Sequence, residues 1–186
     1  IYVRHVGFAG SWGPGGQAGT PGATALPPEL STVTAMPCLL IAWHSQSGTC
    51  ARLAAAALAG AGRADGARVT AGRCEDLGSV EVAAAGGLLL VAAENAGRLA
   101  GGAKQFLDRV FYPSIDRDLV LPAAVLVSAG NDGRNAVGDI ERMLKGIPFT
   151  PATEPLIIRG LPGPGDLARA GELGEALATG LALGLF

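Results

Sequence analysis

A short stretch of the chain gathers hydroxyl side chains around a single glycine. It reads His44-Ser-Gln-Ser-Gly-Thr49 and lies between an apolar run and an alanine-rich segment. At a helix N-terminus, free backbone N–H groups and the positive end of the helix dipole face an incoming anion. Gly48 would let the backbone approach a phosphate closely. The stretch therefore predicts a phosphate-binding loop, although a serine or threonine before a helix can also be only an N-cap.

Other phosphate-binding motifs are absent from the sequence or misplaced. No Gly-x-x-x-x-Gly-Lys-Ser/Thr motif occurs, and no Gly-x-Gly-x-x-Gly follows the apolar run. A phosphatase of similar topology would need a cysteine at the start of the loop and an arginine six positions later, but Cys50 ends the loop and Arg52 is too close. The acidic residues of a receiver domain are also missing. Nucleotide hydrolysis, Rossmann-type binding and these two classes lose support.

The elements that must position this loop follow from apolar runs and helical spacing. Strands are expected at 38–43, 68–71, 87–92, 123–127 and 156–158, and helices at 51–61, 103–112, 140–147 and 170–181. The second helix is expected to end near Tyr112 because Pro113 follows. The alternation predicts an α/β fold, a three-layer doubly wound parallel sheet of five strands between helices. Loops 44–50, 93–103 and 128–134 should then share the carboxyl edge, where ligands bind.

Composition limits the remaining possibilities. The chain has 186 residues, 49% hydrophobic, which suits one domain with a sizeable core. A net charge of -2 offers no broad basic surface, so we expect no nucleic-acid or membrane partner. The three cysteines show no Cys-x-x-Cys spacing, which favours a reducing, cytoplasmic location. Residues 1–35 are rich in Gly and Pro without apolar periodicity, and we predict a disordered or non-native extension before a domain at 36–186.

Several motifs resemble the flavodoxin family. The loop at 44–49 is similar to the FMN-phosphate loop of flavodoxins, commonly Ser/Thr-x-Ser/Thr-Gly-x-Thr. The stretch Glu94-Asn-Ala-Gly97, with Gly101 and Lys104-Gln-Phe-Leu-Asp-Arg109, resembles NAD(P)H-dependent FMN reductases and related short flavodoxin-like proteins. Residues 128–133 and the ending at 172–186 are similar to the same group. Together these likenesses cover nearly all of the predicted domain.

The resemblance implies a strand order of 2-1-3-4-5 with FMN at the carboxyl edge. It places the FMN phosphate in the first loop and the isoalloxazine ring beside the other two. The cofactor-binding residues predicted in this way are Ser45, Gln46, Ser47, Gly48, Thr49, Cys50, Ala93, Glu94, Asn95, Ala96, Gly97, Gly130, Asn131, Asp132 and Gly133. No catalytic side chain and no metal ligand is predicted, because the flavin itself carries the chemistry.

The activity implied by the resemblance is an NAD(P)H-dependent oxidoreductase that passes electrons through FMN to a small-molecule or protein acceptor. The alternatives are an electron-carrier flavodoxin and an interaction module without cofactor. Three positions depart from the family pattern: Ala93 stands where Pro is usual, and Ala96 and Arg98 stand where aromatic residues are common. We therefore expect flavin stacking to be weak or to be supplied by a second subunit of a homo-oligomer.

Four further features have ordinary structural interpretations. Trp43 lies among apolar neighbours, so core packing is favoured over contact with a flavin. For His44 we favour a structural hydrogen bond to the loop. Cys50 is either a thiol with a lowered pKa at a helix start or a buried small hydrophobe. The charged residues of 104–109 are expected to be scaffold positions and not proton donors.

Overall fold

The computed structural model describes residues 36–186. The extension predicted at 1–35 lies outside these described residues. The strands are β1 Cys38–Trp43, β2 Arg68–Arg73, β3 Gly87–Asn95, β4 Arg98–Leu99, β5 Leu121–Ala129, β6 Phe149–Pro151 and β7 Leu156–Arg159. The helices are α1 Thr49–Ala61, α2 Ser79–Ala83, α3 Gly101–Asp116, α4 Arg134–Gly146 and α5 Pro164–Ala182.

The strands form one sheet in the order β2-β1-β3-β5-β6, with β7 also paired to β5. These pairings are parallel, and among the strands of residues 36–186 only the short β4 runs antiparallel, beside β3. Because β6 and β7 are two parts of one edge position, the order corresponds to the predicted 2-1-3-4-5. The doubly wound α/β fold and its strand order are therefore confirmed.

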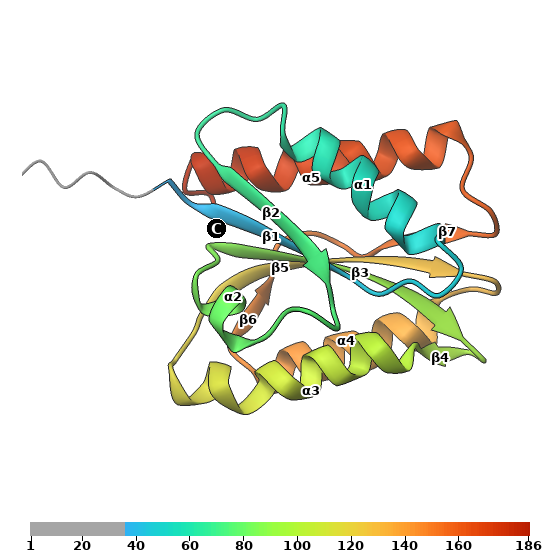
Figure 1. Cartoon of the computed structure of the whole chain (residues 1–186), viewed down its shortest axis with the longest axis horizontal. Coiled ribbons are helices and arrows are strands. Elements are labelled where there is room, and N and C mark those ends of the chain that lie inside the picture. The colour runs from blue at the N-terminus through green and yellow to red at the C-terminus, as the bar shows by residue number, and fades with distance from the viewer. Residues whose placement is uncertain (1–35) are drawn as a thin grey trace, which may run out of the picture. The chain divides into compact units, whose positions relative to one another are not determined.

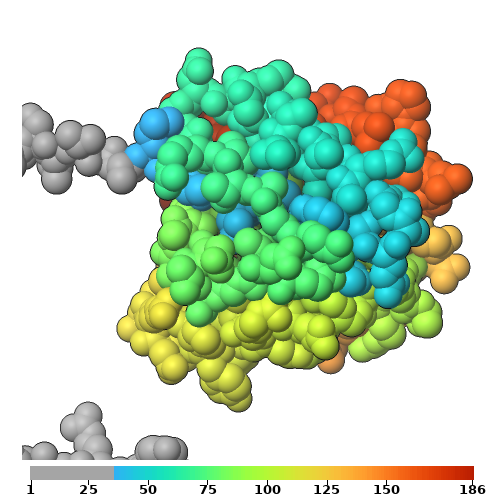
Figure 2. All heavy atoms as spheres, in the orientation of Figure 1, coloured from blue at the N-terminus to red at the C-terminus, as the bar shows by residue number. Residues whose placement is uncertain are grey.

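Helices cover both faces of the sheet, with α1 and α5 on one side and α3 and α4 on the other (Figure 1). One core cluster joins buried side chains of the sheet to α3 and α4, and includes Phe106, Leu107 and Ile140. A second cluster lies under α1 and α5 and includes Leu53 and Leu177. In the space-filling view, atoms of β2 and of neighbouring segments cover β1 in part (Figure 2). Burial on both faces explains why the central strands are continuous apolar runs.

Small residues allow α1 and α5 to approach each other closely. A Cβ added at Gly60 would overlap the Gly171 backbone, and one added at Gly174 would overlap the Ala57 backbone. The alanine and glycine content of both helices is thus explained by helix–helix contact as well as by contact with the sheet. This packing fixes α1, and with it the loop that precedes α1.

The predicted end of the second helix was wrong. Helix α3 does not end near Tyr112 but continues through Pro113 to Asp116. A proline inside a helix removes the hydrogen bond from its own nitrogen and crowds the carbonyl four residues earlier. The buried face of α3, which extends to Ser114, nevertheless favours continuing the helix. The strand predicted at 156–158 corresponds to β7, and a further short strand that was not predicted, β6, precedes it along the edge of β5.

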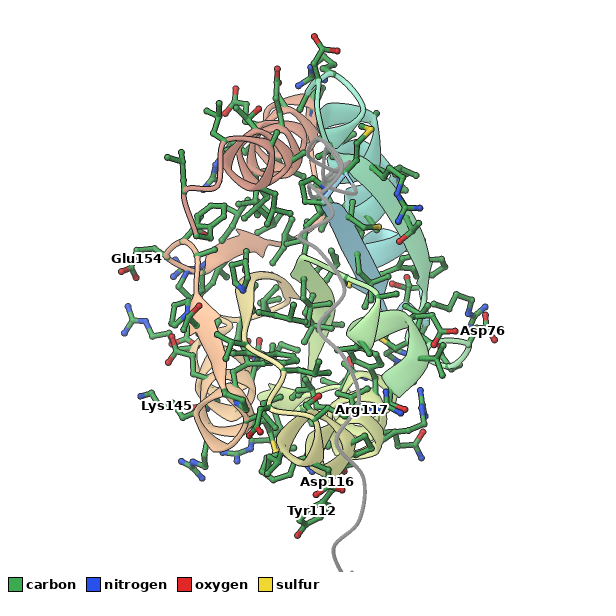
Figure 3. All side chains as sticks on the ribbon, turned by 90° about the vertical axis from the view of Figure 1, so that its left-hand side faces the viewer. Asp76, Tyr112, Asp116, Arg117, Lys145 and Glu154 are labelled. Carbon is green, nitrogen blue, oxygen red and sulfur yellow. The ribbon has the colours of Figure 1, made fainter. Side chains whose placement is uncertain are left out.

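Charged side chains lie mainly at the periphery. Asp76, Asp116, Lys145 and Glu154 lie at the edge of the molecule in Figure 3. Within residues 36–186, no helix has the length and apolar character needed to cross a membrane. Nor do His, Cys, Asp and Glu side chains in that range form a group of three or more that could hold a metal ion.

Candidate functional site

A cavity of about 360 Å³ opens at the carboxyl ends of β1, β3, β5 and β7. It is lined by Ser45, Gln46, Ser47, Thr49, Cys50, Ala93, Glu94, Asn95, Ser128, Ala129, Gly130, Gly160 and Leu161. The three loops predicted to meet at one edge therefore do meet there. Among these lining residues none is Lys or Arg and none is aromatic, so donors for an anion must come from backbone N–H groups, amides and hydroxyls.

The first loop leads directly into an open helix N-terminus. Gly48 is the N-cap of α1 with a φ of 88°, and no side chain caps the helix. The first turn of α1 contains no acidic residue. The first intrahelical hydrogen bond runs from the Arg52 N–H to the Gly48 carbonyl over 3.0 Å, so the N–H groups of residues 49–51 have no partner within the helix. The loop therefore does not serve as a side-chain N-cap, because the N-cap residue is Gly48, which has no side chain to cap the helix.

Hydroxyl groups hold the first loop in shape. The Gly48 N–H donates to Ser45 Oγ over 3.0 Å, and Ser47 Oγ lies 3.3 Å from Thr49 Oγ1. A Cβ added at Gly48 would meet no atom within 4 Å. The left-handed backbone at Gly48 and the open space beside it form a cradle in which a phosphate can approach the main chain.

Side chains connect the first loop to the second, and the second to the third. Asn95 Nδ2 donates to Gln46 Oε1 over 2.8 Å. The Asn131 N–H donates to Glu94 Oε2 over 3.2 Å. These two bonds extend across the edge from β1 to β5, so the three loops form one connected rim.

The second loop is a hairpin and not the irregular segment expected after residue 92. Strand β3 continues to Asn95 and returns as β4, with Asn95 opposite Arg98. Ala96 and Gly97 form the turn with φ values of 49° and 73°, both in the left-handed region. The hairpin carries Glu94 and Asn95 into the cavity wall.

The structure separates the predicted site residues into two groups. The cavity wall contains Ser45, Gln46, Ser47, Thr49, Cys50, Ala93, Glu94, Asn95 and Gly130. Outside the wall lie Gly48, Ala96, Gly97, Asn131, Asp132 and Gly133. Gly48 still shapes the cradle as the N-cap of α1, Gly133 is the N-cap of α4, and Asp132 accepts the Arg134 N–H over 3.0 Å.

Sequence reasoning missed four wall residues. Ser128 and Ala129 end strand β5, and Gly160 and Leu161 follow β7. Leu161 is 87% exposed and gives the wall its largest aliphatic side chain. The same rule that joined the other loops, carboxyl ends of parallel strands at one edge, would have added the residues after the last strand.

The cysteines are poorly placed to act as nucleophiles. Burial raises the pKa of the Cys50 thiol to about 11, and a hydrogen bond with the Ser128 backbone offsets this only in part. Burial also raises the pKa of Cys74 to about 12, with further effects from Glu75, Arg109, Cys50 and its own backbone. The possibility of a lowered pKa at Cys50 was therefore wrong, and the small buried hydrophobe was the correct interpretation.

The other singled-out residues have structural partners. Trp43 is half-buried against the α1–α5 core, with the Arg73 guanidinium carbon 5.6 Å from its ring centre. Lys104 pairs with Asp108 over 2.5 Å. Arg109 donates to the Leu77 carbonyl over 3.0 Å and also to the Cys74 carbonyl. The charged positions of α3 are thus scaffold positions, as expected.

Comparisons with solved structures agree with this architecture. The chain is similar to a flavodoxin from the domain Archaea, with 17% identity and a TM-score of 0.67 over 77% of this chain and 98% of that one. A flavodoxin, WrbA-like protein from Agrobacterium tumefaciens has 15% identity and a TM-score of 0.66 over 79% of this chain and 98% of that one. A metal-soaked Flv1 flavodiiron core from Synechocystis sp. PCC6803 has 19% identity and a TM-score of 0.68 over 80% of this chain.

The chain has a flavodoxin-like fold. It spans 37% of the flavodiiron core but nearly the whole length of the flavodoxin-type structures. No protein-family model and no curated protein sequence matches the chain. At these identities the likeness concerns the fold, so function must be argued from the site.

Proposed function

We propose that the chain binds FMN in the cavity at the carboxyl edge and acts as an NAD(P)H-dependent oxidoreductase. The observation that carries the proposal is the uncapped N-terminus of α1, which follows a glycine with φ 88° in a hydroxyl-rich loop. This loop opens into the cavity that the ends of β3 and β5 also line. A phosphate and an attached flat ring would find their partners in one connected rim.

The residues present suit such a ligand. Ser45, Ser47 and Thr49, with the free N–H groups at the start of α1, would hold the phosphate. The main chain of 93–95 and 128–130 would border the ring and supply donors and acceptors to its polar edge. Bound FMN would supply hydride acceptance and electron release, while the protein binds and orients it.

Support for the nicotinamide donor is the resemblance of 94–109 to NAD(P)H-dependent FMN reductases. Support for electron transfer is the fold shared with proteins described as flavodoxins and as a rubredoxin oxygen:oxidoreductase. The final acceptor is proposed by class, a small molecule or a protein partner.

A spectrum of the purified protein loaded with FMN, followed by anaerobic mixing with NADPH or NADH, tests the proposal. Yellow protein that is bleached rapidly by either donor is the expected result. Yellow protein that ignores both donors would instead indicate the electron carrier. Protein that stays colourless with excess FMN would indicate the interaction module and would overturn the proposal.

A further inference from the structure

We propose that His44, held by Glu75, is a positioning residue for the phosphate-binding loop, and that this contact determines the preference of the cavity for FMN over riboflavin. The inference rests on the proposed function. It concerns the residue that directly follows β1 and immediately precedes the loop at 45–48.

Three separate elements hold His44. Its backbone N–H donates to the Val91 carbonyl of β3 over 3.1 Å, which extends the β1–β3 pairing by one residue. Its Nδ1 lies 2.5 Å from Oε1 of Glu75, which follows β2. The third element is helix α3, which packs on the ring at Gly102. The His44 side chain is only 10% exposed, although it neighbours a loop of exposed residues.

The direction of the side-chain hydrogen bond can be deduced. Desolvation alone would raise the pKa of Glu75, but hydrogen bonds from its own backbone and from His44, the charge of His44 and a bond from Arg73 lower it on balance. An ionised carboxylate only accepts, so Nδ1 of His44 carries the donated proton. Nε2 is buried and has no partner within the described part of the chain. Glu75 is therefore the side-chain anchor that sets the ring orientation.

The start of α3 is shaped to this ring. A Cβ added at Gly102 would overlap Nδ1 and Cε1 of His44, whereas one added at the neighbouring Gly101 would meet nothing within 4 Å. Glycine is thus required at 102 by the histidine and not by the helix itself. The histidine is clamped between α3 and Glu75 with no room to move toward α3.

The position of His44 directly affects the phosphate cradle. Ser45 follows His44 in the chain, and its Oγ accepts the Gly48 N–H over 3.0 Å. A displacement of His44 must therefore shift Ser45 and change the Gly48 turn that precedes α1. The ring of the flavin is bordered by β3 and β5 instead, so riboflavin binding should be much less sensitive.

The two adjacent glycines provide a matched experiment. We expect Gly102→Ala to weaken FMN binding about tenfold, which corresponds to ~1.4 kcal/mol, and to change riboflavin binding by less than about twofold. Gly101→Ala should leave the FMN to riboflavin ratio unchanged, although both changes add the same methyl group to one helix. Alanine favours helix over glycine, so a loss specific to Gly102 cannot come from helix propensity. Isothermal titration calorimetry gives both dissociation constants.

Substitutions at Glu75 test the anchor independently, in case Gly102→Ala fails to fold. Glu75→Ala should lower the preference for FMN over riboflavin, measured as the ratio of the two dissociation constants, about tenfold. Glu75→Gln keeps an acceptor for Nδ1 and should restore most of the preference, although it loses the charge that faces Arg73. Asp76→Ala is the charge control, because Asp76 is the next residue and lies at the edge of the molecule (Figure 3).

The outcomes separate this inference from the proposed function. Wild-type protein that binds FMN and riboflavin equally, or a Gly102→Ala protein that keeps the wild-type ratio, would overturn the positioning role while leaving FMN binding intact. An Asp76→Ala effect as large as that of Glu75→Ala would also overturn it, because general charge would then explain the loss. Wild-type protein that binds neither flavin would overturn both proposals.

Discussion

Gly48 is the residue on which the phosphate cradle depends most directly. Its φ of 88° is unfavourable for a β-branched side chain, and the space around a Cβ there is open. We expect Gly48→Val to weaken FMN binding about tenfold or more, which is ~1.4 kcal/mol per tenfold change, and riboflavin binding much less. Riboflavin has no phosphate to place in the cradle. Isothermal titration calorimetry with both flavins provides the comparison.

A second glycine supplies the control for backbone strain. Gly184 follows α5, has a φ of 63° and would also give a Cβ no neighbour within 4 Å. Gly184→Val should therefore add similar strain without changing either flavin affinity. If Gly48→Val weakened FMN and riboflavin equally, the assignment of the phosphate to this loop would be refuted.

Glu94 brings a carboxylate into the cavity wall, where it accepts the Asn131 N–H over 3.2 Å. Two unit charges about 7 Å apart at an effective dielectric near 20 interact by roughly 2 kcal/mol before screening by solvent. We expect Glu94→Gln to raise the midpoint potential of bound flavin, because an anionic reduced flavin would no longer be repelled. Potentiometric titration at fixed pH and salt measures the change.

Asp132 was predicted beside the flavin on the same grounds but differs in its surroundings. It lies outside the cavity wall, and its carboxylate is 3.7 Å from the Arg134 side chain. Asp132→Asn should thus shift the potential less than Glu94→Gln does. Unchanged potentials in both variants, with FMN still bound, would remove these carboxylates from the tuning of the flavin.

The lowered pKa of Glu75 predicts a pH dependence of stability. A carboxyl group whose pKa is lower in the folded state stabilises the fold above its unfolded pKa of about 4.3. That contribution is lost as the pH falls through the folded-state value. We expect Glu75→Gln to lessen the decline in urea stability below about pH 5. Wild-type and variant curves that decline in parallel would contradict this.

At the scale of elements, the sequence predicted the strands correctly where burial on both faces requires a continuous run of apolar residues. The segments at 38–43, 87–92 and 123–127 are apolar throughout because helices cover both faces of the sheet. It failed where tertiary contacts override a local signal. Pro113 inside α3 is one case, and the turn at Ala96 is another, because alanine at positive φ gives no turn signal.

The sequence predicted which loops meet at the candidate site, but not the side-chain hydrogen bonds that connect them. Parallel strands present their carboxyl ends at one edge, which brought together loops distant in sequence. The hydrogen bonds from Asn95 to Gln46 and from Asn131 to Glu94 could not be foreseen, because they depend on side-chain directions after the strands are in register. The anchoring of His44 by Glu75, instead of by the loop, was missed for the same reason.

The elements that end at the cavity contribute no aromatic side chain to its wall. Flavin fluorescence is strongly quenched when an electron-rich tryptophan or tyrosine stacks on the ring. We expect FMN bound to this protein to keep a large part of its free fluorescence. Steady-state emission and lifetime measurements, with guanidinium release of the flavin as the reference, will show this. Strong quenching would indicate an aromatic residue from a second subunit, to be checked by sedimentation.

At the scale of the whole molecule, residues 36–186 contain a sheet with a core cluster on each face. Both clusters are formed by strands and helices of this range, with α1 against α5 on one side and α3 with α4 on the other. The sequence of 1–35 has no periodic apolar face to add to either cluster. The fold and the cavity should therefore be independent of those residues.

A variant that begins at Met36 tests this independence. We expect its melting temperature to change by less than about 2 °C, because 1 kcal/mol corresponds to roughly 2–4 °C for a domain of this size. Its flavin content after loading with FMN should equal that of the full chain, since every wall residue of the cavity lies beyond residue 44. Calorimetry and the flavin absorbance per protein measure the two quantities. A loss of stability with full flavin content would locate a contact of the first residues on the domain away from the cavity, whereas a loss of flavin alone would locate it at the carboxyl edge.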